Sequence, residues 1–503
     1  MRPKGRTEAL RAISKSLCIP HWQDGFGRVA SLSSMSEKSK FHFTGICGTA
    51  MGAVAAAMKQ RGFSVTGSDA NVYPPMSDFL RGQGITLTEG YNEENIPADT
   101  DVVIIGNAIS RGNPEAEAAL DRKLLYHSLP EVMKEFFLRG KRNFVVSGTH
   151  GKTTTSSMLA WIFVNAGRDP GYMIGGLPKN LGHGAHFTDS DFNVLEGDEY
   201  DTAFFDKRSK FLHYLPECVV VNNVEFDHAD IYNNIDEIKL TFRRLLNIVP
   251  RGGMAYVNGD EQNCLDVAEK APCPVTTVGF GENCSLRIEN LNYDTDRSSF
   301  TLGGVSFSVP MTGEFNVRNA AMAAAAATFA GLTVTEIRDG LDSFEGVARR
   351  QELKGEVNGI KVIDDFAHHP TAIRLAVQSL RQRHPDSRLW ILFEPRSNTT
   401  RRAIFQTELA ESLALADFAV VAAIPDLHKI PENDRLDPTK LSADIARFGG
   451  QGWYLPDIES IIAKVTECAA PGDIIAVLSN GGFGGIHQKL LTALAKPTAA
   501  LVK

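Results

Sequence analysis

The 503-residue sequence lacks the features of a membrane, secreted or nucleic-acid-binding protein. No apolar run approaches the roughly 18 to 20 residues that a membrane-spanning helix requires. The seven cysteines are odd in number and form no Cys-x-x-Cys pair, which favours reduced thiols over a disulfide framework or a zinc site. The formal net charge is −8, and no long block of like charges occurs. We therefore expect a cytoplasmic protein without nucleic-acid or membrane partners.

The composition is that of a globular protein, with 43% hydrophobic and 22% charged residues. A chain of this length exceeds one hydrophobic core, so several domains are expected. The basic N-terminal segment has no apolar core typical of a secretory signal. Residues 1–38 are therefore predicted to be a disordered extension, and Met35 is a candidate for the true start.

From residue 40 onward, short apolar runs such as "DVVIIGNA", "LWILFEPR" and "DIIAVLSNGG" alternate with longer segments of helical periodicity. Strands that are apolar throughout are typical of parallel sheets with helices on both faces. In such sheets ligands bind at the carboxyl ends of the strands. The sequence therefore predicts an α/β protein with domains at 39–139, 140–345 and 346–503, the second of which contains a strand-rich insertion, "SLRIENLNYDTDRSSFTLGGVSFSVP".

A glycine loop, "GTHGKTTT" from residue 148, follows the strand "NFVVS" and opens a segment of helical periodicity. This order directs backbone N–H groups and a helix N-terminus at an anion, with Lys152 reaching phosphates and Thr153 placed to bind Mg²⁺. An ordinary strand-to-helix turn does not explain Gly-Lys-Thr at this point. Val146 stands where a generic hydrolase loop has its first glycine. The loop therefore predicts nucleotide binding without predicting simple hydrolysis.

Acidic and imidazole side chains follow two further strands of the central domain. Glu196 ends the strand of "FNVLEGDEYD", where its carboxylate could complete a Mg²⁺ site with Thr153. Asp227 and His228 follow "CVVVNNVE", and His228 is a candidate ligand for a second metal ion. A solvated acidic turn and a structural histidine are the alternatives.

Polar loops also follow strands in the outer two domains. "GICGTAMG" fails the dinucleotide fingerprint, because Cys47 and Ala50 replace glycines, but a nucleotide diphosphate could still bind there. Ser68 and Asp69 end the next strand and could meet a ribose or base, although simple turn chemistry is the alternative. In the third domain "IDDFAHHPTAI", "FEPRSNTTRR" and "LSNGGFGGIHQKLL" predict one shared substrate face.

These features together resemble the Mur ligase family of ATP-dependent, amide-forming enzymes of cell-wall precursor synthesis. The resemblance rests on "GTHGKTTT", "EGDEY", "NNVEFDHAD", "GEFNVRNA", "GVARRQE" and "DDFAHHPTAI", and it covers nearly the whole chain from residue 40. It implies a Rossmann-like N-terminal domain for a UDP-sugar, a P-loop ATPase-like central domain for ATP and Mg²⁺, and a Rossmann-like C-terminal domain for the amino compound.

Within the family, "SDANVYPPM", "GNAISRGNPE" and "FFDKRSKFLHY" are similar to members that join UDP-N-acetylmuramate to the recycled tripeptide L-alanyl-γ-D-glutamyl-meso-diaminopimelate. The alternative is the member that adds L-alanine to the same nucleotide, which usually carries a GxGGxGM loop and lacks "DKRSKF". Two alternatives come from other classes: an NAD-dependent dehydrogenase and a non-catalytic ATP-binding switch. We expect a monomer or a weak homodimer.

The resemblance also implies roles for individual residues. Lys152, Glu196 and His228 would be catalytic, and Thr153, Glu196 and His228 would bind metal. The ATP-binding residues would be Gly148, Thr149, His150, Gly151, Lys152, Thr153, Thr154, Asn180, Asn316, Asn319, Arg350 and Asp365. The UDP-sugar would contact Gly45, Cys47, Gly48, Thr49, Met51, Ser68, Asp69 and Asn107. The peptide would contact His368, His369, Arg396, Ser397 and Asn398. Some members use a carbamylated lysine, but the spacing of Lys239 does not fit that role.

Overall fold

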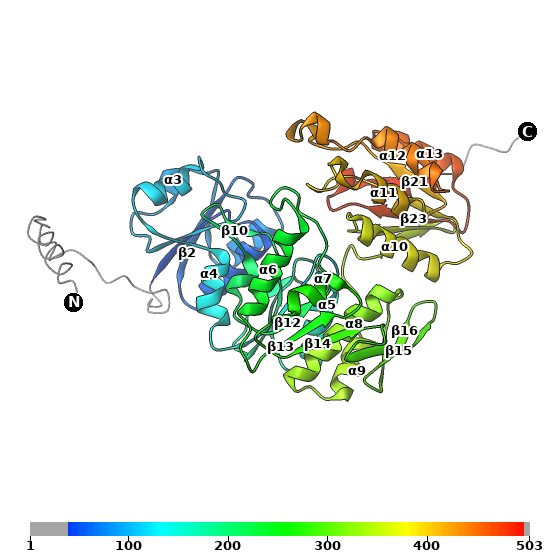
Figure 1. Cartoon of the computed structure of the whole chain (residues 1–503). Helices are drawn as coiled ribbons and strands as arrows, with labels where there is room; N and C mark the ends of the chain where they lie inside the picture. Colours follow the sequence, from blue (N-terminus) through cyan, green and yellow to red (C-terminus); the bar gives the residue numbers. More distant parts are fainter. Residues whose placement is uncertain (1–38, 497–503) are drawn as a thin grey trace, which may run out of the picture. The chain divides into compact units, whose positions relative to one another are not determined.

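The computed structural model describes residues 39–496, so the prediction for residues 1–38 lies outside the described part of the chain. Within it, three separate sheets built mainly from parallel strands follow one another along the sequence, with helices between the strands. Figure 1 shows the first sheet in blue, the second in green and the third in yellow to red. The predicted α/β fold is confirmed. In the described range, no helix combines the length and apolar character needed to cross a bilayer.

The first sheet has five parallel strands in the order β3-β2-β1-β4-β5. Because the strand order reverses between β1 and β4, the loops after these two strands diverge and leave a crevice at their carboxyl ends. Its elements are β1 (Lys40–Thr44), α1 (Thr49–Gln60), β2 (Ser64–Asp69), α2 (Met76–Gly82), β3 (Thr86–Glu89), β4 (Val102–Ile105), α3 (Pro114–Asp121), β5 (Leu125–Ser128) and α4 (Leu129–Met133).

The second sheet has ten strands in the order β17-β16-β15-β14-β13-β12-β6-β9-β7-β8. Strand β6 lies between β12 and β9 and is parallel to both, so the loops after these three strands meet at one edge. The predicted strand-rich insertion forms β15, β16 and β17, which pair antiparallel.

The elements of this domain begin with β6 (Arg142–Ser147), α5 (Lys152–Asn165), β7 (Gly171–Met173), β8 (Ala185–His186), β9 (Phe192–Glu196), β10 (Asp201–Ala203), β11 (Asp206–Ser209) and β12 (Pro216–Val221). They continue with α6 (Ile235–Asn247), β13 (Met254–Asn258), α7 (Gln262–Ala268), β14 (Val275–Gly279), β15 (Leu286–Tyr293), β16 (Ser298–Leu302), β17 (Val305–Val309), α8 (Glu314–Ala330) and α9 (Val334–Asp342). Strands β10 and β11 form a separate two-stranded hairpin.

The third sheet has six strands in the order β18-β19-β23-β20-β21-β22, parallel except for β18. Its elements are β18 (Glu352–Val357), β19 (Ile360–Asp365), α10 (Pro370–Arg383), β20 (Leu389–Phe393), α11 (Gln406–Leu413), β21 (Phe418–Val421), α12 (Pro438–Arg447), β22 (Gln451–Tyr454), α13 (Ile458–Cys468), β23 (Ile474–Leu478) and α14 (Ile486–Leu494).

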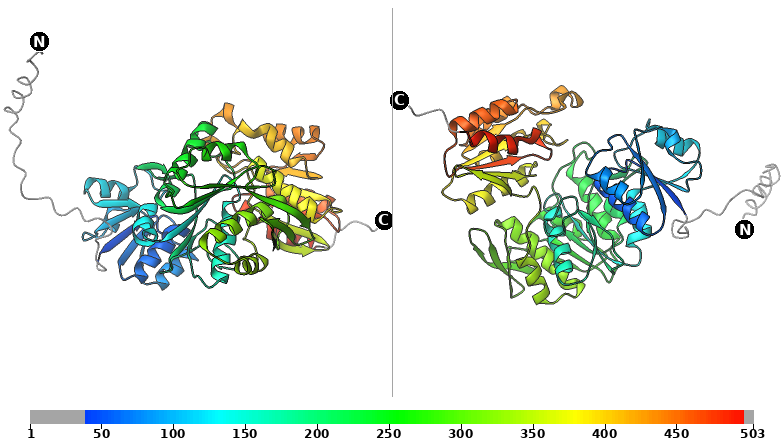
Figure 2. Two further views of the ribbon diagram at one scale, coloured as in Figure 1. Left: turned by 60° about the horizontal axis from the view of Figure 1, so that its bottom comes forward. Right: turned by 180° about the vertical axis from the view of Figure 1, so that it is seen from behind.

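Both faces of this third sheet are covered by helices, as Figure 2 shows. Successive residues of a strand point to opposite faces. Ile391 and Phe393 of β20 accordingly join a core with α10, α11 and α12, whereas Trp390 and Leu392 join one with α13 and α14. A strand buried on both faces is apolar at every position, and polar residues appear only in the loop that follows it. The carboxyl ends therefore carry the polar side chains.

Candidate functional site

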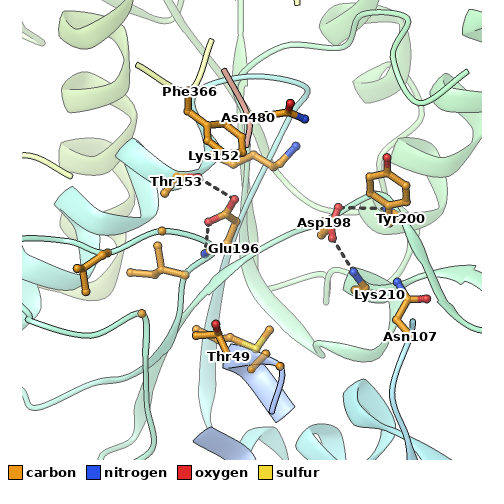
Figure 3. A pocket seen from close by; sticks show the side chains of 18 of the residues that line it. Thr49, Asn107, Lys152, Thr153, Glu196, Asp198, Tyr200, Lys210, Phe366 and Asn480 are labelled. Atoms are coloured by element: carbon orange, nitrogen blue, oxygen red, sulfur yellow. Dashed lines mark hydrogen bonds and ion pairs between the residues drawn. The ribbon is translucent and has the colours of Figure 1, made fainter. Parts of the chain in front are cut away.

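One cavity of about 1350 Å³ is lined by loops from all three domains. It exceeds the usual size of a site for one small ligand, so it has room for more than one substrate. Loops that follow β1, β4, β6, β9, β12, β19, β20 and β23 contribute to its lining. Figure 3 shows part of this cavity, with Lys152, Thr153 and Glu196 on one side and Thr49 on another.

Most of the predicted site residues line this cavity. From the ATP set these are Thr149, His150, Gly151, Lys152, Thr153, Thr154, Asn316, Asn319, Arg350 and Asp365, together with Glu196 and His228. From the UDP-sugar set they are Gly45, Cys47, Gly48, Thr49, Met51, Asp69 and Asn107. From the peptide set they are His368, Arg396, Ser397 and Asn398.

The structure places the other four elsewhere. The Ser68 hydroxyl donates to Glu115 Oε2 at 2.5 Å in the interior of the first domain, so its side chain faces away from the cavity. Asn180 accepts from the Glu345 backbone N–H at 2.7 Å and donates to the Ser343 carbonyl, which fastens its own loop. Gly148, the first residue of the glycine loop, packs against the backbone of Asn222 and Asn223, and His369 faces a second cavity.

The glycine loop is held by the segment that follows β12. The His150 N–H donates to Asn223 Oδ1 at 2.6 Å, and the Thr149 N–H donates to the Asn223 carbonyl. Gly151 has φ +77°, and a Cβ there would lie 2.6 Å from Asn319 Oδ1. Both the left-handed backbone and the close approach require glycine.

Lys152, the first residue of α5, points into the cavity between the loop and a carboxylate. Its Nζ donates to Glu199 Oε2 at 2.9 Å and to the Gly148 carbonyl at 2.6 Å. Burial alone would lower the pKa of Lys152, but the carboxylates of Glu199 and Asp198 outweigh it and raise the pKa above its usual value. The side chain is therefore a fixed cation at neutral pH.

Thr153 and Glu196 form a pair of oxygen ligands beside Lys152. The Thr153 hydroxyl donates to Glu196 Oε1 at 2.9 Å, and the Gly175 N–H donates to Glu196 Oε2 at 2.6 Å (Figure 3). Burial raises the pKa of Glu196 above its usual value, which indicates that this carboxylate lacks enough positive charge around it. A hydroxyl and a carboxylate are ligands that suit Mg²⁺, so the donor set fits this ion.

Glu199 connects Lys152 to His228, and sequence reasoning gave it no role. His228 Nε2 lies 2.9 Å from Glu199 Oε1, and Glu199 is only 2% exposed. Burial opposes protonation of His228, but Glu199 and Asp227 raise its pKa. The sequence signal was its place in "EGDEY", which contains three acids in four residues without showing which one faces the loop.

The hairpin β10–β11 adds a second cation to the cavity. Lys210, which follows the hairpin, donates to Asp198 Oδ2 at 2.7 Å (Figure 3), and both residues line the cavity. Phe204 and Phe205 at the turn pack on the apolar cluster of the first domain that contains Val103. The hairpin and Lys210 therefore link the first domain to the loop after β9 that carries Asp198.

Two buried asparagines of α8 offer unused polar atoms to the cavity. Among residues 39–496, Asn316 Oδ1 and Asn319 Nδ2 are buried without a hydrogen-bond partner. One is an acceptor and the other a donor, which suits a ligand with both functions, such as a nucleotide base. A buried polar group without a partner is costly, so a ligand that pairs with it gains affinity.

The junction of the second and third domains brings a cation to the Mg²⁺-type pair. Arg350 Nη2 donates to Thr153 Oγ1 at 3.3 Å, and Arg350 Cζ lies 4.6 Å from the centroid of the Phe366 ring. Asp365 accepts from the Gln351 N–H at 2.8 Å and so holds this junction. Lys239, in contrast, pairs with Asp266 at 2.8 Å and is not among the residues that line the cavity.

His369 lies against the glycine loop instead of the first cavity. Its Nδ1 is 3.1 Å from His150 Nε2 and 3.6 Å from Glu225 Oε2. Burial, together with the nearby His150, lowers the pKa of His369 to about 4, so the ring is neutral at pH 7. Glu225 and His369 border a second cavity of about 510 Å³, whereas His150 lines the first.

Comparisons with known proteins agree with this geometry. Residues 40–141 match the Mur ligase family catalytic domain, residues 146–327 the Mur ligase middle domain, and residues 349–481 the glutamate ligase domain of Mur ligases. The UDP-N-acetylmuramate--L-alanyl-gamma-D-glutamyl-meso-2,6-diaminoheptandioate ligase of Escherichia coli is 42% identical over 92% of this chain and 99% of its own length.

Two further relatives have names that differ in the amino compound they add. A UDP-N-acetylmuramate--L-alanine ligase of Desulforapulum autotrophicum is 31% identical over 90% of this chain and 98% of its own length. The crystal structure of a murein peptide ligase from Psychrobacter arcticus is 36% identical, covers 92% of this chain and 100% of its own, and superposes with a TM-score of 0.67. The ligase relationship decides against the dehydrogenase alternative. The chain belongs to the Mur ligase family.

Proposed function

We propose that this enzyme joins UDP-N-acetylmuramate to L-alanyl-γ-D-glutamyl-meso-diaminopimelate in an ATP-dependent ligation, as part of murein recycling in the bacterial cytoplasm. The observation that carries the proposal is the 42% identity, over nearly the full length of both chains, with a ligase of that printed name. The cavity shared by three domains supports it, because the reaction needs a nucleotide sugar, ATP and a peptide together.

The reaction has to activate a carboxylate, because its oxygen is a poor leaving group. The muramoyl carboxylate oxygen attacks the γ-phosphorus of ATP, ADP leaves, and an acyl phosphate forms. The peptide amine then attacks the acyl carbon, the C–O bond to phosphate breaks, and the amine loses a proton. Proximity of the three ligands in one cavity supplies much of the rate enhancement.

We assign the charge-bearing part of this reaction to the loop after β6. Lys152 offsets the negative charge that gathers on the transferred phosphoryl group, and Glu199 holds its ammonium group in place. Backbone N–H groups at the start of α5 face the same anion. Asn316 and Asn319 offer a free acceptor and a free donor to the adenine.

Mg²⁺ fits the oxygen ligands of Thr153 and Glu196, and a second ion fits His228 with Glu199. When bound, such ions neutralise triphosphate charge and so lower the repulsion between the nucleotide and the attacking carboxylate. Arg350 would orient Thr153 from the third domain.

The sugar nucleotide would lie at the carboxyl ends of β1 and β4. Gly48 precedes α1 and its loop is open to the cavity, so the start of this 12-residue helix suits a diphosphate. Asp69 accepts from the Cys47 N–H at 2.9 Å and shapes this loop. The peptide would contact His368, Arg396, Ser397 and Asn398, which line the part of the cavity that the third domain provides.

A panel of amine donors tests the substrate. The full-length enzyme, with ATP, Mg²⁺ and UDP-N-acetylmuramate, is given L-alanine, the tripeptide, or the tripeptide acetylated at its α-amine, and phosphate release and product mass are measured. We expect kcat/KM for the tripeptide to exceed that for L-alanine by about 10²-fold or more. The acetylated tripeptide should be inert, because the attacking amine is blocked.

The reverse preference would assign the L-alanine-adding reaction. Phosphate release that is indifferent to every amine would instead support an ATP-binding switch without ligase activity. With the dehydrogenase already excluded, the panel therefore separates the three functions that remain.

A further inference from the structure

We propose that His150, Glu225 and His369 form a binding site for one divalent transition-metal ion that prefers imidazole ligands, such as Zn²⁺. His150 Nε2 lies 3.1 Å from His369 Nδ1 and 3.7 Å from Glu225 Oε2, and His369 Nδ1 lies 3.6 Å from the same oxygen. Ligands about 2.0 to 2.2 Å from a tetrahedral ion are about 3.3 to 3.5 Å apart. The three atoms therefore match one face of a tetrahedron.

Neighbouring groups orient two of these ligands. His369 Nε2 lies 3.1 Å from the Phe226 carbonyl, so the N–H donates there and Nδ1 carries the lone pair. Nδ1 accepts from the Thr371 N–H at 3.3 Å, a long contact that a bound ion would replace. The Thr371 hydroxyl donates to Glu225 Oε2 at 2.6 Å and fixes the carboxylate. Hydrogen bonds of this kind to the ligating side chains are typical of metal sites in proteins.

Hydrogen bonding alone explains only part of the cluster. A proton on His150 Nε2 can satisfy the contact with His369, but Glu225 Oε2 is beyond hydrogen-bond distance of both rings. The side chains of His150, Glu225 and His369 are 12%, 24% and 4% exposed, so they are largely shielded from water. Glu225 Oε2 thus converges on the two ring nitrogens without a hydrogen bond to either, which suits an ion between the three atoms.

The site differs in position and chemistry from the Mg²⁺ ligands of the main cavity. Thr153 and Glu196 supply oxygen, whereas two imidazoles favour Zn²⁺, Co²⁺ or Ni²⁺. Glu225 and His369 line the second cavity, which gives an ion a path from solvent and room for water as a fourth ligand.

The ligands come from three segments: His150 from the glycine loop, Glu225 from the loop after β12, and His369 from the residue that caps α10. A bound ion would therefore fasten the nucleotide loop to the third domain. This inference does not depend on which amine the enzyme uses.

Co²⁺ provides the test, because its visible absorption reports the ligands. The full-length protein, freed of metal with a chelator, is titrated with Co²⁺ in excess Mg²⁺. We expect one Co²⁺ per chain with the visible bands of nitrogen and oxygen ligation, and displacement by Zn²⁺. His369→Gln and Glu225→Gln should each weaken Co²⁺ binding more than ~100-fold, since each removes a direct ligand.

His384→Gln is the matched control, because His384 is the residue that ends α10, the helix that His369 begins, and lies outside the cluster. It should bind Co²⁺ like the wild type, and circular dichroism establishes that each variant is folded. The proposal would be overturned if both cluster variants bound Co²⁺ as tightly as the wild type, or if no Co²⁺ bound at all. It would also be overturned by thiolate charge-transfer bands or by displacement of Co²⁺ by Mg²⁺. If one cluster variant does not fold, the other decides.

Discussion

Lys152 is the residue whose charge the site depends on most. It is held by Glu199 and by the Gly148 carbonyl, and the raised pKa keeps it protonated at neutral pH. Lys152→Ala should lower kcat for ligation by about 10²–10³-fold, because charge on the transferred phosphoryl group is no longer offset. UDP-sugar binding, measured by calorimetry, should persist, because those contacts come from the first domain.

Lys239→Ala is the control for this change. Its ammonium group also pairs with a carboxylate, that of Asp266, but outside the cavity. Ligation should continue at close to the wild-type rate. Retained turnover in Lys152→Ala would refute the assigned role.

Glu199 positions both Lys152 and His228 without needing to touch a substrate. Glu199→Gln keeps the size of the side chain but removes the charge, so we expect kcat/KM for ATP to fall about 10–100-fold. The Mg²⁺ concentration for half-maximal rate should also rise, which a purely structural role would not cause. Steady-state kinetics across a Mg²⁺ series measures both effects.

Glu217→Gln serves as the comparison, since Glu217 also pairs with a cation, Arg142, away from the cavity. An unchanged Mg²⁺ dependence in Glu199→Gln would show that the residue does not support the metal ligands.

The sequence predicted that Lys152, Thr153, Glu196 and His228 belong to the site, because each lies at or shortly after the end of a predicted strand and within a short motif. Glu199 was not predicted, since the bend after β9 decides which carboxylate turns toward the loop. Ser68 and His369 were placed by sequence near substrates, but side-chain direction placed one in the interior and the other at the second cavity. Direction depends on local packing that spacing does not contain.

At the scale of elements, comparing the glycines at the two ends of α5 distinguishes the effect of a left-handed backbone from that of a steric contact. Gly151 has φ +77° and Gly167 φ +71°, but a Cβ would meet Asn319 only at Gly151. Each change to alanine should cost about 1 kcal/mol of unfolding free energy from the left-handed backbone. Only Gly151→Ala should also weaken ATP binding, by about tenfold or more, because the loop or Asn319 must move.

Chemical denaturation and nucleotide titration of the two variants measure these effects. Equal ATP affinity in both would show that the close approach of the loop to α8 is not required.

Strands with both faces buried could be predicted, but the edge strands β3, β18 and β22 could not. β4, β20 and β23 are buried at every position, so their sequences are continuous apolar runs. β3, β18 and β22 lie at sheet edges and are partly exposed, so they carry polar residues and no clear run. Their strand conformation comes from pairing with a neighbour, which is a tertiary interaction.

At the scale of the whole molecule, the hairpin β10–β11 couples two domains. The rings of Phe205 and Tyr126, a β5 residue, are 4.9 Å apart and meet edge to face. Phe205→Ala should weaken UDP-N-acetylmuramate binding by about 2–10-fold, the value of one such aromatic contact, and leave ATP binding unchanged. Calorimetry with each ligand in turn tests this.

Phe448→Ala provides the control, because Phe448 is 47% exposed in the third domain. An equal loss of affinity for both ligands in Phe205→Ala would indicate general destabilisation instead of coupling through the hairpin.

The sequence by itself determined the α/β class, the phosphate loop and the family resemblance. These are local properties, because apolar runs, glycine spacing and strand-end motifs are written in consecutive residues. The domain boundaries at 139 and 345 and the expected monomer or weak homodimer stay predictions. Only the tertiary structure decided that Glu199 joins Lys152 to His228, and that His150, Glu225 and His369 converge. Those contacts link residues 29 to 219 positions apart, and only the packing of sheets and loops brings such residues together.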